Sequence, residues 1–134
     1  MANTFKCEII TPGKVVYSDS IRSVTAEGYD GSFGVLAGHA PLIAELQCGI
    51  LTITDSNNQT LRFALDGGFF EVFDNSVVIL TDMCAKEGEV DIEKVRAEKE
   101  VAEKTLSGAR DGKERERAQA SVKRADTWLR LANK

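Results

Sequence analysis

Hydrophobic and polar residues alternate with a period of two along the first part of the chain. The segments FKCEII (5–10), ILTITD (50–55) and LRFALD (61–66) each place apolar side chains on one face, as half-buried β-strands do. Between such segments lie groups of turn-forming residues, at 11–13, 55–58, 67–68 and 74–76. Their spacing of roughly 8 to 12 residues is typical of all-β sandwiches and barrels. The pattern predicts an N-terminal antiparallel β-sandwich over residues 1–85.

The hydrophobic period changes to that of an α-helix after Gly88. Gly108 ends a first apolar stripe, and Asp111 followed by Glu114 has the spacing of a capping box that starts a second helix. The two stripes consist of Ile92, Val95, Ala102 and Leu106, and of Ala118, Val122, Ala125, Leu129 and Ala132. Because the connection is short, we expect a C-terminal antiparallel two-helix hairpin over residues 89–134. The predicted fold class is therefore α+β.

The second stripe is rich in alanine, so the hairpin buries little apolar surface. At about 25 cal/mol per Å2 of such surface, a hairpin of this kind is only marginally stable by itself. We therefore expect it to lie on another surface and to be mobile.

The formal net charge of −4 is distributed unevenly along the 134 residues. Residues 1–84 hold four basic and ten acidic side chains, whereas residues 85–134 hold 13 and 11. From Arg110 to Lys134 there are eight basic and four acidic side chains, an excess that favours an acidic partner. A solvated helix face explains the same excess equally well.

The sequence also excludes some classes of protein. No apolar run approaches the ~20 residues that a membrane-spanning helix needs, and the N-terminus lacks a basic segment followed by a long apolar one. The cysteines Cys7, Cys48 and Cys84 are far apart and lie in apolar runs, as buried free thiols do. We therefore expect a protein of the reducing cytoplasm.

Residues suited to catalysis or metal binding are few. His39 is the only histidine and the cysteines lack C-x-x-C spacing, so no metal site is predicted. A triad of Ser32, His39 and Asp66 lacks a G-x-S-x-G elbow, so no catalytic residue is predicted. The nearby glycines lack the G-K-[ST] ending of a phosphate loop. Structural roles in turns are predicted instead for Gly31, Gly34, Gly38, His39 and Pro41.

The stretch YDGSFGVLAGHAPLIAEL (29–46) is the remaining candidate site. Apolar residues between turn-forming glycines favour an exposed docking loop. Its predicted contact residues are Tyr29, Asp30, Ser32, Phe33, Val35 and Leu36. An alternative is a freestanding β-sandwich module, in which this loop holds a small molecule and the helical tail mediates dimerisation.

Two blocks of the sequence resemble a known family. The segment GSFGVLAGHAPLIAELQCGILTI (31–53) resembles the signature G-x-x-G-[VI]-x-x-G-H-A-P-L of the epsilon subunit of bacterial F-type ATP synthases. The segment ALDGGFFEVFDNSVVILTDMC (64–84) and the two C-terminal helices extend the resemblance over nearly the whole chain. The resemblance implies a non-catalytic rotor subunit of the central stalk, which couples proton translocation to ATP synthesis and inhibits ATP hydrolysis.

The same resemblance implies the partners. The β-sandwich would bind the gamma subunit and the c-ring, with residues 29–36 facing the ring; Asp30 would meet a basic ring loop, and Ser32 stands where some relatives carry an acidic residue. The hairpin would lie folded on the sandwich or extend to the catalytic alpha and beta subunits. Its inhibitory contacts are assigned to Arg115, Arg117, Lys123, Arg124 and Arg130. The protein would be peripheral at the cytoplasmic face of the cell membrane, attached only through the complex, and would not bind nucleic acid.

The segment IEKVRA (92–97) resembles the I/L-D-x-x-R-A motif with which some family members bind ATP. The matching positions are Ile92, Glu93, Arg96 and Ala97. Because Glu93 replaces the aspartate of the motif, weak or absent ATP binding is expected, and no other cofactor is.

Overall fold

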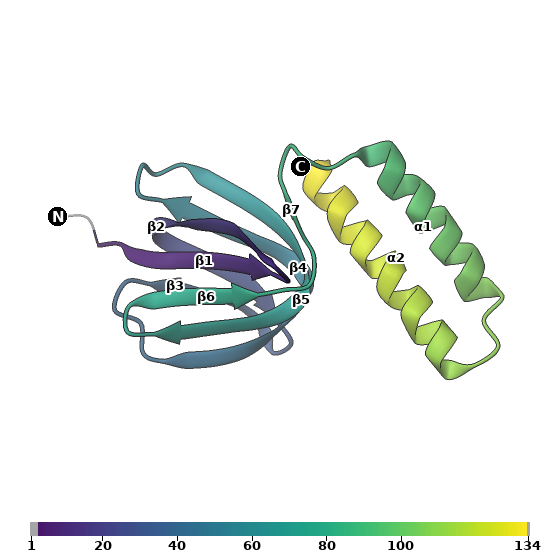
Figure 1. The fold of residues 1–134 in the computed structure, drawn as a ribbon, viewed down its shortest axis with the longest axis horizontal. Helices are drawn as coiled ribbons and strands as arrows, with labels where there is room; N and C mark the ends of the chain where they lie inside the picture. Colours follow the sequence, from purple (N-terminus) through teal and green to yellow (C-terminus); the bar gives the residue numbers. More distant parts are fainter. Residues whose placement is uncertain (1–2, 134) are drawn as a thin grey trace.

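All strands precede the helices in the computed structural model, which describes residues 3–133 (Figure 1). The strands are β1 (Phe5–Thr11), β2 (Lys14–Gly28), β3 (Gly31–Leu36), β4 (Leu42–Asp55), β5 (Thr60–Phe73), β6 (Ser76–Leu80) and β7 (Cys84–Lys86). The helices are α1 (Ile92–Ser107) and α2 (Gly112–Ala132). The predicted order of a β-domain followed by two helices is confirmed.

The strands form one sheet that curls until its ends meet. Its order is β1-β6-β5-β4-β2-β3, and β1 also pairs with β2, which closes the ring β1-β6-β5-β4-β2. Strand β3 extends the sheet beyond β2, and the short β7 pairs with β5. The pairing is antiparallel as predicted, except between β1 and β6, which run parallel. The predicted β-sandwich is thus confirmed in a barrel-like form, called the barrel below.

Alternation along the strands gives the barrel one apolar core. Its largest fully buried side chains include Phe63, Phe70, Ile9, Ile21, Leu51, Ile53 and Ile79. Strand β5 also buries Ala64, which lies between the core residues Phe63 and Leu65. Because successive residues of a strand face opposite sides, both faces of β5 are covered at this point. The helical hairpin lies on the outer face, against β4 and β5.

The turn predicted at Gly67 and Gly68 is wrong, because β5 continues through both residues. The ladder between β4 and β5 skips Gln47 and Gly67. The two glycines have φ of +73° and +127°, and a Cβ atom on Gly68 would collide with the carbonyl oxygen of Leu80. They therefore permit an irregularity in a bent strand where no other residue fits without strain. The other three predicted turns lie between strands and are confirmed.

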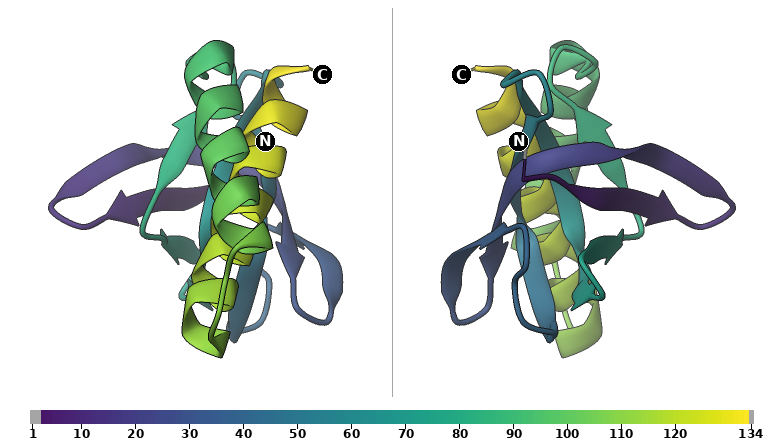
Figure 2. Two further views of the ribbon diagram at one scale, coloured as in Figure 1. Left: turned by 90° about the vertical axis from the view of Figure 1, so that its right-hand side faces the viewer. Right: turned by 90° about the vertical axis from the view of Figure 1, so that its left-hand side faces the viewer.

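The two helices form the predicted antiparallel hairpin (Figure 1). Each begins at an aspartate cap. Asp91 accepts the N–H of Lys94, and Asp111 accepts the N–H of Glu114 at 2.8 Å, which confirms the predicted cap. Helix α2 lies against the barrel, while α1 packs on α2 away from the strands, as Figure 2 shows from two sides. The buried residues of the hairpin are Val95, Ala102, Ala118, Ala125, Thr127 and Leu131. The first four belong to the predicted stripes.

Candidate functional site

His39 lies in the loop between β3 and β4, with its side chain exposed. Its Nδ1 is 2.6 Å from the carbonyl oxygen of Ala40. Gly31 at the start of β3 and Gly38 in the loop beside His39 have φ of +116° and +80°, where glycine is favoured. Gly34 differs, because it pairs with β2 in the middle of β3. The turn role predicted for Gly34 is therefore wrong.

The predicted docking stretch forms a strand rather than a loop, since residues 31–36 are β3, paired with β2. Its exposed residues are Tyr29, Asp30, Ser32 and Leu36, of which Tyr29 and Leu36 are 67% and 66% exposed. Tyr29 and Asp30 form the turn between the two strands. These four side chains are the part of the stretch that a partner can reach.

Val35 and Phe33 point the other way. Val35 is buried in the barrel core, and Phe33 is half-buried and packs edge-to-face on Phe70, with ring centroids 5.0 Å apart. The prediction that these two side chains are exposed for docking is wrong. The reason is the period of a strand, which turns alternate side chains to opposite faces.

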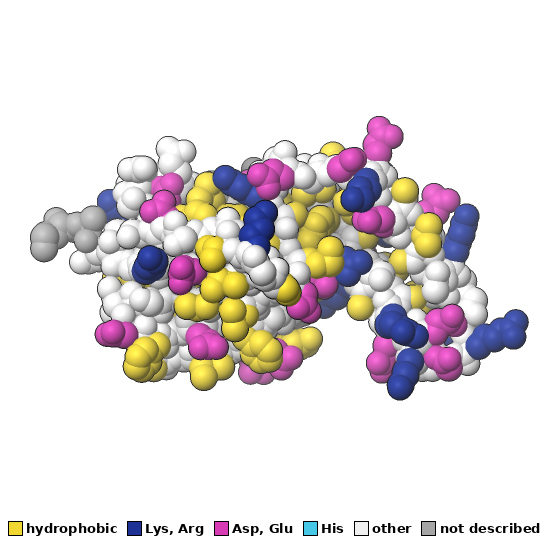
Figure 3. Space-filling model, viewed as in Figure 1, with side chains coloured by type: hydrophobic (Ala, Val, Ile, Leu, Met, Phe, Trp, Pro, Cys, Tyr) yellow, Lys and Arg dark blue, Asp and Glu magenta, His cyan; other side chains and the backbone are white. Residues whose placement is uncertain are grey.

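The outer faces of β4, β5 and β6 carry an apolar patch that the sequence analysis missed (Figure 3). The patch consists of Ile43, Phe69, Phe73 and Leu80, which are 39–74% exposed. Strand pairing places Phe69 between Glu45 and Leu80, so that acidic groups border the patch. The segment FFEVF (69–73) carried the clue, because it puts aromatic residues on both faces of one strand. Contiguous exposed apolar side chains are typical of binding surfaces, so this patch is a candidate site.

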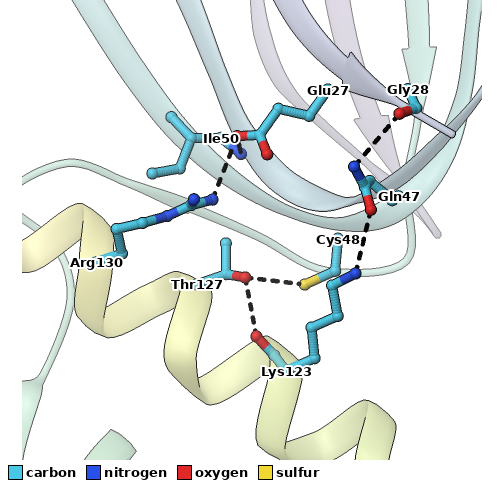
Figure 4. Close-up of polar contacts among 8 residues, drawn as sticks. All are labelled: Glu27, Gly28, Gln47, Cys48, Ile50, Lys123, Thr127 and Arg130. Carbon is cyan, nitrogen blue, oxygen red and sulfur yellow. Dashed lines mark hydrogen bonds and ion pairs between the residues drawn. The ribbon is translucent and has the colours of Figure 1, made fainter. Parts of the chain in front are cut away.

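Helix α2 meets the barrel through a continuous set of polar contacts (Figure 4). The Thr127 hydroxyl donates to the carbonyl oxygen of Lys123 at 2.8 Å and accepts a hydrogen bond from the Cys48 thiol at 3.4 Å. The Lys123 Nζ donates to Gln47 at 3.2 Å, and the Gln47 amide donates to the carbonyl oxygen of Gly28 at 3.3 Å. Hydrogen bonds therefore connect the helix to both β4 and β2.

Two ion pairs accompany these hydrogen bonds. Arg130 contacts Glu27 at 3.2 Å, and Arg124 contacts Asp66 at 3.4 Å. The two carboxylate side chains are only 28% and 25% exposed. Glu27 also accepts the backbone N–H of Ile50 at 2.8 Å (Figure 4). The contact between hairpin and barrel thus joins basic groups of the helix to acidic groups of the sheet.

The five cations predicted to make inhibitory contacts divide into two sets. Lys123, Arg124 and Arg130 are engaged with the barrel. Arg115 and Arg117 form no ion pair within residues 3–133. The charge excess of this helix is therefore neither wholly solvated nor wholly free for a partner.

A groove of about 730 Å3 runs between α1 and α2 and is bordered by Met83 from the barrel. Of the four residues that resemble the ATP motif, only Ala97 lines this groove. Glu93 and Arg96 are exposed on α1, and Ile92 is half-buried. The helical positions of the motif therefore do not converge on one ligand site in this arrangement.

The described residues offer few other groups suited to catalysis or metal binding. Burial raises the pKa of Cys7 to about 12 and that of Cys84 to about 11. The pKa of Cys48 is raised by burial and partly lowered by its hydrogen bond with Thr127. Among the described residues, no three His, Cys, Asp or Glu side chains cluster as metal ligands would. Neither helix in residues 3–133 is long and apolar enough to cross a membrane.

Two family models match the chain, and together they describe a β-domain carrying helices. The one described as "ATP synthase, Delta/Epsilon chain, beta-sandwich domain" matches residues 4–87. The one described as "ATP synthase, Delta/Epsilon chain, long alpha-helix domain" matches residues 89–133. The fold and its surfaces thus define an ATP synthase subunit of the delta/epsilon type.

Two curated relatives show which family within this class the chain belongs to. The ATP synthase epsilon chain of Syntrophomonas wolfei is 35% identical over 132 residues, which cover 98% of this chain and 96% of that protein. The ATP synthase epsilon chain of Syntrophobacter fumaroxidans is 40% identical over 135 residues, covering 100% and 99%. The chain belongs to the ATP synthase epsilon chain family, and the resemblance found in the sequence is confirmed.

Solved structures support the fold. A chain of the Euglena gracilis mitochondrial ATP synthase (OSCP/F1/c-ring in rotational state 1) superposes with a TM-score of 0.82 at 22% identity, covering 96% of this chain and 81% of that one. A chain of the Tetrahymena thermophila mitochondrial ATP synthase (central stalk/c-ring) gives a TM-score of 0.63 at 18% identity, covering 93% of each. Both likenesses support the overall fold.

Proposed function

We propose that this protein is a non-catalytic rotor subunit in the central stalk of a bacterial F-type ATP synthase. In this role it couples proton translocation to ATP synthesis, and its C-terminal hairpin inhibits ATP hydrolysis. Membership of the epsilon chain family supports the proposal. The observation that carries the inhibitory role is the docking of the hairpin on the barrel through polar groups, because such contacts can be exchanged for those of a partner.

The barrel supplies the contacts that hold the protein in the stalk. The apolar patch of Ile43, Phe69, Phe73 and Leu80 binds the gamma subunit, because burying exposed aromatic side chains stabilises an interface. The turn at Tyr29 and Asp30 meets the c-ring, together with Ser32 and Leu36. The protein is held at the cytoplasmic face of the membrane only through these partners.

The hairpin supplies the regulatory contacts. When it leaves the barrel and extends, its cations bind acidic surface on the catalytic alpha and beta subunits and stop hydrolysis. ATP binds weakly or not at all to the docked hairpin, because Glu93 and Arg96 do not line the groove between the helices.

Deletion of the hairpin tests whether the barrel and the hairpin have separate roles. Removal of residues 89–134 should leave assembly intact while raising ATP hydrolysis by the soluble complex, since the gamma and ring contacts belong to the barrel. Equal hydrolysis rates with and without the hairpin, measured on fully assembled complexes, would refute the inhibitory role.

Co-purification with tagged gamma subunit tests the apolar patch. The double substitution Ile43→Asp and Phe73→Asp should abolish co-purification without unfolding the barrel, because both side chains are exposed. Val101→Asp is the control, since Val101 is 64% exposed on α1, outside the barrel. If the control weakens gamma binding as much as the patch variant does, the patch is not the binding surface.

A further inference from the structure

The carboxylate of Glu27 occupies a position that the sheet itself builds. The ladder between β2 and β4 is interrupted between Thr25 and Gly28, and Glu27 stands in this interruption. Its Oε2 accepts the N–H of Ile50 at 2.8 Å. A Cβ atom on Gly49 would lie 2.8 Å from the Cδ of Glu27, so a larger residue at that position would displace the Glu27 side chain. Glu27 is therefore held by the barrel independently of the helix.

Asp66 lies on β5, which β4 separates from β2 in the sheet. It precedes the irregularity at Gly67 in β5, and its backbone N–H donates to the carbonyl oxygen of Met83 at 3.0 Å. Its side chain is 25% exposed and faces Arg124 of the helix. The sheet thus presents two partly buried carboxylates to helix α2, and that of Glu27 is held by a hydrogen bond within the barrel.

The cations that these carboxylates hold, Arg130 and Arg124, are among those to which inhibition is assigned. One guanidinium cannot pair with the barrel and with a distant partner at the same time. We propose that Glu27 and Asp66 are retaining groups, which compete with the acidic surface of the partner for Arg130 and Arg124 and so keep the hairpin docked. The regulatory consequence rests on the proposed function, whereas the docking itself does not.

The remaining cations of α2 have a complementary part in this competition. Arg115 and Arg117 pair with no acidic group in the described part of the chain while the hairpin is docked. They can therefore contact an acidic partner before the docked cations are released. Two partly exposed ion pairs shift the equilibrium between the docked and the released hairpin by roughly two- to thirtyfold, which keeps docking reversible. Added salt should weaken docking, because it screens these pairs.

Cys48 offers a reporter of docking in the protein as it exists. Its thiol is half-buried against Thr127 and becomes more accessible when α2 leaves, whereas Cys7 stays buried in the barrel core. In a Cys84→Ser background, the rate of Cys48 modification by a thiol reagent should rise about two- to thirtyfold in the double variant Glu27→Gln and Asp66→Asn. The matched control is Glu8→Gln with Asp19→Asn, which changes net charge equally on β1 and β2 and should leave the rate unchanged.

A helix-side variant, Arg124→Gln with Arg130→Gln, breaks the same pairs without touching the sheet. It should raise Cys48 modification to a similar extent in the isolated chain. In the assembled complex the two variants should act oppositely on ATP hydrolysis: the sheet-side variant should lower it by releasing intact cations, and the helix-side variant should raise it by removing them.

The outcomes separate the two proposals. Unchanged Cys48 modification in the sheet-side variant, with Cys7 still protected, overturns the retaining role. If Cys7 becomes reactive in the sheet-side variant, the barrel has opened and that variant is uninformative. The helix-side variant then decides: an unchanged rate of Cys48 modification in it overturns the retaining role. Faster Cys48 modification in both variants with unaltered hydrolysis supports the retaining role and contradicts the proposed inhibition.

Discussion

The barrel and the hairpin are held in place by different kinds of contact. The barrel closes around large, fully buried apolar side chains such as Phe63 and Phe70. Among the buried residues of the hairpin, only Val95 and Leu131 are larger than threonine or alanine, and its contact with the barrel includes two ion pairs and several hydrogen bonds. The same chain thus combines a region closed by buried apolar side chains with a region attached through polar groups.

The physical reason lies in what each contact leaves behind when it breaks. When apolar side chains leave a core they become exposed to water, which costs free energy. Ion pairs and hydrogen bonds released from a surface are replaced by water or by a partner at little net cost. A region that must change partners is therefore better attached by polar groups, and the predictions below test this contrast.

The largest effect is expected for a charge in the barrel core. Val35→Asp should destabilise the barrel by more than about 4 kcal/mol, because an unpaired carboxylate replaces a side chain that is 1% exposed. The neighbouring change Leu36→Asp is the matched control and should cost less than about 0.5 kcal/mol, since Leu36 is exposed. Urea unfolding of both variants measures the difference. Similar midpoints would mean that β3 does not belong to the rigid region.

This pair of residues also shows where sequence alone succeeded and where it failed. The alternation of FKCEII and the helical stripes of the C-terminal part correctly predicted the fold class and the order of the elements. The cap at Asp111 was also predicted correctly. The glycines of residues 31–38 hid a strand with the same alternation, so Val35 was assigned to the surface. A short glycine-rich strand has too few apolar positions for its period to stand out.

The contacts between hairpin and barrel were beyond the sequence for a different reason. Glu27 and Arg130 lie 103 residues apart, and no local pattern joins them. The cations were noticed as a charge excess, but their partners depend on which strands the hairpin covers. The apolar patch escaped because a second apolar face on a strand is indistinguishable from a deeper core until the neighbours of that face are known.

High pH should weaken the barrel through Cys7. Its pKa rises from an ordinary value of 9.0 to about 12, because burial disfavours the thiolate. Below pH 9 the thiol is protonated in the folded and unfolded chain alike. Above pH 9 Cys7 ionises only in the unfolded chain, so this thiol should lower the free energy of unfolding by about 1.4 kcal/mol per pH unit toward pH 12. Urea unfolding from pH 8 to pH 11 measures the slope, and Cys7→Ala should reduce it; an identical slope in that variant contradicts the assignment.

The helix cap should matter for the hairpin and not for the barrel. Asp111→Ala removes the acceptor of the Glu114 N–H at 2.8 Å and should destabilise the start of α2 by about 1 kcal/mol. Amide hydrogen exchange should speed up in the first turn of α2 and stay unchanged in β5. Asp126→Ala is the control on the same helix, since Asp126 pairs with Lys99 at the surface and its loss should have a smaller effect. Faster exchange throughout the barrel would show that the two regions unfold as one.

The smallest effect is expected for the buried hydroxyl of Thr127, which lies between helix α2 and the barrel. Thr127→Val keeps the shape of a side chain that is 4% exposed and removes a hydroxyl that bonds mainly to its own helix, at the carbonyl oxygen of Lys123. The bond lost toward the barrel is the weak one from the Cys48 thiol at 3.4 Å. Docking should therefore change by less than about 0.5 kcal/mol, which is roughly a twofold change in the rate of Cys48 modification. If Thr127→Val instead frees Cys48 as strongly as the loss of Glu27 and Asp66 does, the buried hydroxyl rather than the carboxylates holds the hairpin, and the contrast between an apolar barrel and a charge-held hairpin has to be redrawn.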